Sequence, residues 1–113
     1  MRSPGKTTVA PDVLLAIARL TALKVDGVHS MGSAPRWNRD GKSDEGVLAH
    51  IDNERVDLDI YLVLNKDTNL RQVSREVQSQ VARAIEESIG MDAGRINVHI
   101  DDVYFPALTT PAS

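Results

Sequence analysis

The chain has 113 residues, of which 42% are hydrophobic and 26% are charged, the ordinary composition of a single globular domain. Its 13 basic and 16 acidic side chains give a net charge of −3, so the overall charge does not attract nucleic acid or anionic lipid. The absence of cysteine excludes disulfides, thiolate nucleophiles and the usual structural zinc ligands.

The sequence holds no apolar run long enough to span a bilayer. Its N-terminus, "MRSPGK", is polar and lacks the apolar core of a signal peptide. We therefore expect a cytoplasmic protein that does not insert directly into the membrane.

The first expected elements are an edge strand at residues 5–10 and a helix at residues 12–24. β-branched residues favour the strand, and Pro11 suits the first turn of the helix. The helix is apolar around more than one stripe, which indicates burial on more than one side. Asp26 and Gly27 end it.

Residues 31–46 show no periodicity over a length that is uncommon for a loop, so we expect a mobile or functional segment there. Alternating apolar residues then predict a hairpin with strands at 47–51 and 56–64. A turn around Asn53 and Glu54 would put both apolar sets on one face and pair Ile51 with Val56, Ala49 with Leu58, and His50 with Asp57.

Apolar residues at spacings of three and four predict a helix from Asn69 to Ile89. Asn69 and Gln72 form a variant of the capping box, and Gly90 suits the left-handed position after the last turn. The final strand is expected at residues 96–105, with Ile96, Val98 and Ile100 on one face and Asn97, His99 and Asp101 on the other.

These elements follow the order β-α-β-β-α-β. They predict a two-layer α+β domain, with a small mixed or antiparallel sheet of about four strands and two helices on one face. The domain is expected to span residues 5–105, and residues 106–113 to form a disordered tail.

Several ligand-type side chains share the sheet face that points away from the helices. They are His50, Asp57, Asp59, His99 and Asp101. Such a group could bind a divalent metal or serve a small hydrolytic domain as an acid/base pair. An open sheet face is polar in any case, and no metal-binding spacing or catalytic motif accompanies these residues. We therefore favour a solvated surface, and expect no catalytic residue, metal or cofactor. The remaining histidine, His29, is expected to be incidental.

A second alternative involves the stretch "PRWNRDGK", in which Arg36, Arg39 and Lys42 surround Trp37. Such a group could stack on bases and contact phosphates in an accessory nucleic-acid-binding module. Acidic residues lie close by in the same segment, so we expect no nucleic-acid binding.

The order and spacing of several stretches resemble the alkaline-shock envelope stress response family, small cytoplasmic proteins of Gram-positive and related bacteria. The resemblance covers residues 5–105. The stretches that carry it are "GKTTVAPDVLLAIARLTALKVDGVHSM", "VDLDIYLVL", "VSREVQSQVARAIEESIGM" and "INVHIDDV". The chain departs from the family at "GSAPRWNRDGKSDEG", where members often have a longer, glycine-rich segment.

This resemblance implies a non-enzymatic protein that self-associates and gathers beneath the cytoplasmic membrane through a membrane-anchored partner. Its role would be to support cell-envelope homeostasis under stress. No catalytic residue carries over, because the family has none established.

The helix at residues 12–24 holds more apolar side chains than one sheet needs to cover it. The excess would form an exposed apolar patch, which predicts a homodimer or partner interface. We expect this interface to use Leu15 or its neighbours around the helix, with Arg19 and Trp37 as further interaction residues.

Overall fold

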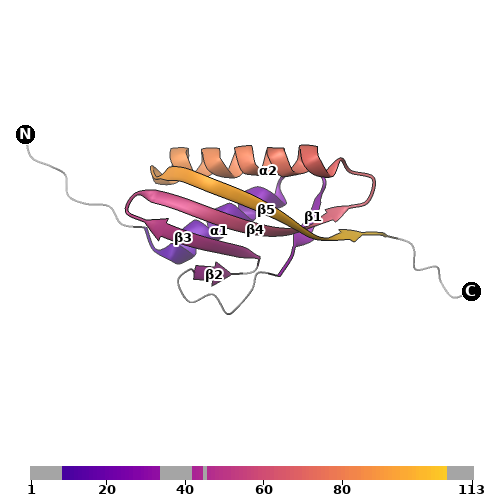
Figure 1. Cartoon of the computed structure of the whole chain (residues 1–113), viewed down its shortest axis with the longest axis horizontal. Helices are drawn as coiled ribbons and strands as arrows, with labels where there is room; N and C mark the ends of the chain where they lie inside the picture. The colour runs from indigo at the N-terminus through magenta and orange to yellow at the C-terminus, as the bar shows by residue number, and fades with distance from the viewer. Residues whose placement is uncertain (1–8, 34–41, 45, 107–113) are drawn as a thin grey trace, which may run out of the picture.

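The computed structural model describes residues 9–33, 42–44 and 46–106. In this part of the chain, two α-helices and a π-helical turn accompany a five-stranded mixed sheet (Figure 1). The elements in chain order are α1 (Pro11–Leu23), β1 (Val28–Met31), β2 (Lys42–Asp44), β3 (Val47–Asp52), β4 (Arg55–Asn65), α2 (Leu70–Ala84), η1 (Ile85–Ile89) and β5 (Asp92–Tyr104).

Strand β4 lies at the centre of the sheet. It pairs in parallel along its length with β5, and antiparallel with β3 and β1. β3 pairs with the first half of β4 and β1 with the second half, so β1 and β3 share the edge of β4 that β5 leaves open. β2 pairs with the outer edge of β3.

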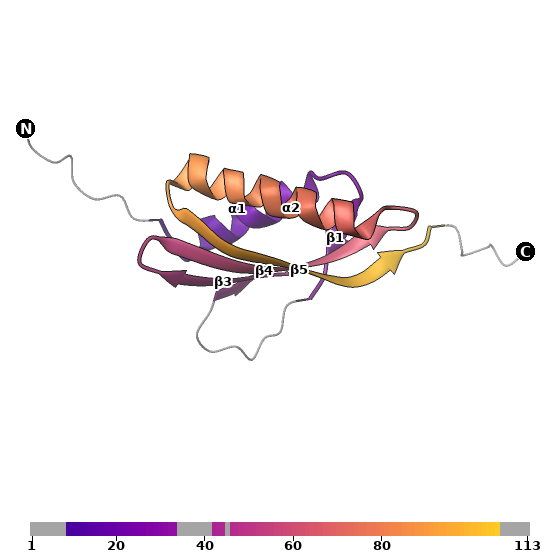
Figure 2. The ribbon, with the colours of Figure 1, turned by 45° about the horizontal axis from the view of Figure 1, so that its top comes forward.

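Both helices cover the same face of the sheet (Figure 2). One continuous core forms between the layers, with alternate residues of β4 at its centre. Full burial of one such aliphatic side chain stabilises the fold by about 1.5–3 kcal/mol, so this core is the main source of stability. Its members from the helical segments are Leu14, Leu15, Ala18, Ala22, Val73, Val77, Val81 and Ile85.

The sequence predicted the start of the first helix and both ends of the second helical segment correctly, and it placed the end of the first helix at Lys24, one residue beyond Leu23. Ala10 is extended (φ −65°, ψ 141°) and Pro11 occupies the first turn of α1. Asn69 caps α2, because its Oδ1 accepts a hydrogen bond from the Gln72 backbone N–H over 3.0 Å. Gly90 ends the second helical segment with a left-handed φ of 83°.

The expected hairpin register is also confirmed. Ile51 faces Val56, Ala49 faces Leu58, and His50 faces Asp57. The apolar face of the last strand is confirmed too, because Ile96, Val98 and Ile100 pack against the core.

The expected order β-α-β-β-α-β is wrong at its start, because the first described element is α1. Residues 5–8 lie outside the described residues, and Val9 and Ala10 are not in a strand since Ala10 is the N-cap of α1. Among the described residues the sheet has five strands rather than about four, because β1 and β2 were not expected. β2 falls within the segment expected to be irregular. Of the expected tail, only Pro106 is described.

Candidate functional site

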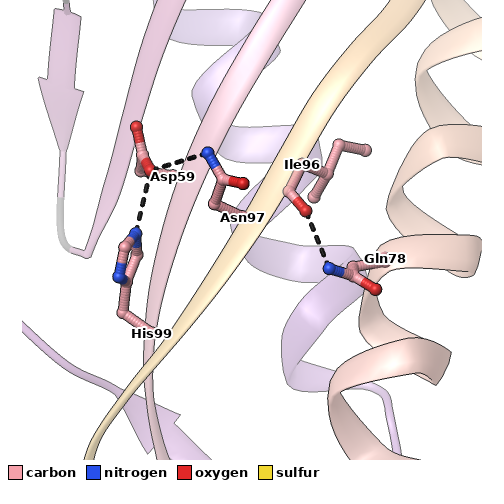
Figure 3. A network of polar contacts seen from close by, with 5 residues as sticks. All are labelled: Asp59, Gln78, Ile96, Asn97 and His99. Atoms are coloured by element: carbon pink, nitrogen blue, oxygen red, sulfur yellow. Dashed lines mark hydrogen bonds and ion pairs between the residues drawn. The ribbon is translucent and has the colours of Figure 1, made fainter.

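The open face of the sheet carries a hydrogen-bonded group between β4 and β5. Asp59 Oδ1 lies 2.8 Å from His99 Nε2 and accepts a hydrogen bond from Asn97 Nδ2 over 3.2 Å (Figure 3). The alternation of β4 places Asp59 on this face, and parallel pairing sets Asn97 directly opposite. The contact to His99 is an ion pair only when the imidazole is protonated.

Next to this group, the ring of His99 stacks on Tyr61, with ring centroids 4.4 Å apart and planes 13° from parallel. Burial raises the pKa of the Tyr61 hydroxyl, and the negative charges of Asp59 and Asp101 raise it further. Asp101, on β5, reaches across β4 to the segment that follows β1. There its Oδ2 accepts a hydrogen bond from the Ser33 backbone N–H over 2.8 Å.

Asp57 occupies a different place on the same face, beside an irregularity in the β4–β5 pairing. Its Oδ1 accepts a hydrogen bond from the Arg95 backbone N–H over 2.7 Å and lies 3.4 Å from Arg55 Nε. The hydrogen bond from Arg95 holds the pKa of Asp57 below its ordinary value, against a smaller opposing effect of burial, and Arg55 lowers it further. Asp57 and Arg55 fill the space beside Gly94, where a side chain would collide with both.

The open face therefore does not bring the five predicted ligand residues together. Only Asp59 and His99 contact each other. Asp57 and Asp101 bind backbone amides elsewhere, and His50 makes no hydrogen bond or ion pair with another described residue. Across residues 9–33, 42–44 and 46–106, no group of three or more histidine, aspartate or glutamate side chains is placed to hold a metal ion.

A second aromatic contact was, like the stack of His99 on Tyr61, not predicted from the sequence. His29 in β1 stacks on Tyr104 near the end of β5, with ring centroids 3.8 Å apart and planes 7° from parallel. The two residues are far apart in the sequence, and no local pattern joins them. The pair is visible only once β1 and β5 are known to flank β4.

A second surface lies on α1, on the side turned away from the sheet. Val13, Leu20 and Leu23 are 49%, 51% and 38% exposed, and Ala16 and Ile17 between them are half-buried. We call these five residues the outer stripe. The opposite side of the same helix holds the core residues, so the excess of apolar side chains expected from the sequence is present.

Leu15 itself is not available to an interface on this helix. Leu15 is 1% exposed and belongs to the core, so it cannot contact a partner without unfolding the helix from the sheet. Arg19 is half-buried. Trp37, Arg36 and Arg39 lie outside the described residues, and the Lys42 side chain is not described either, so the nucleic-acid alternative has no geometry to support it.

Two grooves flank the helices. One of about 560 Å³ lies between the end of α1 and the start of α2. The other, of about 980 Å³, lies by the β3–β4 turn and the end of η1. Neither is lined by Asp57 or Tyr61, the two described side chains with shifted pKa values. The two side chains with shifted pKa values therefore lie on the open sheet face and not in either groove.

These features define a small α+β domain with a polar open face and an apolar helix surface. Solved structures share its fold. A zinc form of a MamM CTD variant matches with a TM-score of 0.60 and 12% identity over 88% of this chain and 92% of that chain. A nickel form of another MamM CTD variant has a TM-score of 0.53 and 12% identity over 80% and 96% of the two chains.

Residues 2–105 match the alkaline shock protein 23 family, described as having a cell envelope-related function, and the chain belongs to this family. Two relatives from Bacillus subtilis carry the name uncharacterized protein. YqhY is 26% identical over 89% of this chain and 78% of its own length, and YloU is 22% identical over 88% of each. In the described part of the chain, no helix is both long and apolar enough to cross a membrane.

Proposed function

We propose that this protein is a non-enzymatic interaction module that self-associates and supports cell-envelope homeostasis under stress through a membrane-anchored partner. The observation that carries the proposal is the outer stripe of α1, in which Val13, Leu20 and Leu23 are exposed and Ala16 and Ile17 between them are half-buried. Membership of a family with a cell envelope-related function supports the cellular setting.

The outer stripe is costly in a monomer. Water must be ordered around an apolar surface that a partner could cover, and large contiguous apolar patches are rare on monomeric proteins. A solvated helix face is normally polar, yet Val13, Leu20 and Leu23 occupy positions that glutamate or lysine could fill without loss of core packing. The stripe is therefore best explained by an interaction.

The open sheet face supports a structural role better than a catalytic one. Asp57 and Asp101 bind backbone amides, and Asp59 accepts hydrogen bonds from neighbouring side chains. Each carboxylate thus stabilises the pairing of strands around β4. A carboxylate that acts as a general acid or base must instead face a substrate pocket.

The test is recovery of partners from membranes of the native host, with the tagged chain and its Leu20→Glu variant as baits. The matched control is Phe105→Glu, because Phe105 is also 51% exposed but follows β5. We expect the chain and Phe105→Glu to recover a membrane protein together with untagged copies of the chain. Leu20→Glu should lose at least one of these. Recovery of neither by the unmodified chain would refute the proposal.

A further inference from the structure

We infer that the outer stripe of α1 binds the outer stripe of a second copy, with the two helices antiparallel across a two-fold axis near Ala16. The inference rests on the proposed function and deepens it, because it names the occupant of the surface and the register of contact.

The spacing of the stripe makes it complementary to itself. Val13 and Leu20 are seven residues apart, about two helical turns, so they lie on one line along the helix with Ala16 between them. When two such helices run antiparallel and are centred near Ala16, Val13 of each copy meets Leu20 of the other. A two-fold interface requires this kind of reciprocal contact.

The side-chain sizes fit close packing at the centre. Ala16 is the smallest residue of the stripe, and the register that pairs Val13 with Leu20 brings it against Ile17 of the other copy, next to the axis. Two helices can then approach to about 8–10 Å, the usual interaxial distance, while Val13 and Leu20 interdigitate on either side. A large side chain in place of Ala16 would meet Ile17 of the other copy and keep the helices apart.

The charges beside the stripe agree with the antiparallel arrangement. Asp12 and Arg19 are also seven residues apart and lie along one margin of the stripe. The same centre places Asp12 of each copy on the same side as Arg19 of the other and about 3 Å from its level along the helix, within reach of two long-range attractions between opposite charges. In a parallel two-fold pair this margin of the two helices would lie on opposite sides of the interface, and neither Asp12 nor Arg19 would meet its opposite charge. Exposed ion pairs add little affinity, but they help to select the orientation of the two helices.

The long edge of β5 is a less suitable surface for self-association. Gln78 of α2 donates a hydrogen bond to the Ile96 carbonyl over 2.9 Å and so occupies one acceptor of that edge (Figure 3). The pairing of β5 with β4 shifts register at two places, and such bulges twist an edge strand away from further pairing.

The experiment uses single cysteines, because the chain contains none of its own. Under mild oxidation, Ala16→Cys should give a disulfide-linked dimer, because the axis brings the two thiols together. Phe105→Cys is the control and should stay monomeric. Val13→Cys and Leu20→Cys should form more crosslinked dimer when mixed than either forms alone. Crosslinking of Phe105→Cys as fast as Ala16→Cys would overturn the inference.

Light scattering across a concentration series provides the second measurement. The unmodified chain and Phe105→Glu should dimerise, and Leu20→Glu should raise the dimer dissociation constant by about tenfold or more while the circular dichroism spectrum is unchanged. A chain that stays monomeric at high concentration overturns the inference. If that monomer still recovers a membrane protein and Leu20→Glu loses it, the stripe binds the anchored partner, and only the two-fold inference fails.

Discussion

Gly32 and Gly46 bind opposite backbone groups of the same residue, Tyr61. The Gly32 N–H donates to the Tyr61 carbonyl over 2.6 Å, and the Tyr61 N–H donates to the Gly46 carbonyl over 2.8 Å. The two glycines therefore close the base of the segment between them. As a result β1 and β3 act as two halves of one strand along β4, separated by residues 33–45.

Gly46→Ala should destabilise the fold through this junction. Gly46 has a φ of 91°, and an added Cβ would lie 2.8 Å from the Gly32 carbonyl oxygen and 2.9 Å from Met31 Cβ. Gly90→Ala is the control, because Gly90 has a similar φ of 83° but nothing within 4 Å of the added atom. We expect a cost of about 1 kcal/mol for Gly90→Ala and roughly 1–3 kcal/mol more for Gly46→Ala in urea unfolding. Equal costs would show that the junction tolerates a side chain.

Truncation to alanine should destabilise the fold strongly at Leu15 and hardly at all at Leu20. Leu15→Ala leaves a cavity between α1 and the sheet, and we expect it to lower the free energy of unfolding by about 2–5 kcal/mol. Leu20→Ala removes a half-exposed side chain and should change the free energy of unfolding by about 0.5 kcal/mol or less at concentrations where the chain is monomeric. A large effect of Leu20→Ala under these conditions would place it in the core.

This contrast also marks a limit of the sequence. The excess of apolar residues on the first helix could be counted, but periodicity cannot say which side of such a helix faces the sheet. Leu15 and Leu20 look equivalent in the sequence and differ completely in burial. The side is decided by tertiary packing, since Leu14, Ala18 and Ala22 lie on the same side as Leu15.

Elements with strong local signals were predicted well, namely the β3–β4 hairpin, the second helix and the apolar face of β5. β1 and β2 were missed because they have only four and three residues, too few to show alternation. The ligand-type residues were placed on the correct face, but alternation cannot show their separation. Register shifts in β5 and backbone amides of Ser33 and Arg95 decide where Asp101 and Asp57 point.

Because the pKa of Asp57 is lowered, part of the stability of the fold should be lost at acid pH. Its pKa is depressed in the folded chain, so its contribution is present above the unfolded value of about 3.9 and is lost as pH falls through the folded pKa. Asp57→Asn should therefore be less stable than the unmodified chain at pH 7, and the difference should narrow below about pH 4.

The measurement is urea unfolding at a series of pH values. Asp67→Asn serves as the control, because the Asp67 side chain is 81% exposed. A difference between Asp57→Asn and the unmodified chain that stays constant from pH 7 to about pH 3 would show that the charge of Asp57 does not contribute.

Tyr61 should make the fold sensitive to alkaline pH. Its pKa is raised in the folded chain by burial and by the charges of Asp59 and Asp101, so the folded state keeps the phenolic proton longer than the unfolded state does. The free energy of unfolding therefore keeps its full value below about pH 10 and falls as pH rises through the folded pKa of Tyr61.

Absorbance titration of Tyr104→Phe isolates Tyr61, since the chain has two tyrosines. The midpoint should lie above that of the same variant in concentrated guanidinium chloride, and Asp59→Asn should lower it. A folded midpoint at or below the denatured one would contradict the half-buried, carboxylate-flanked setting of Tyr61.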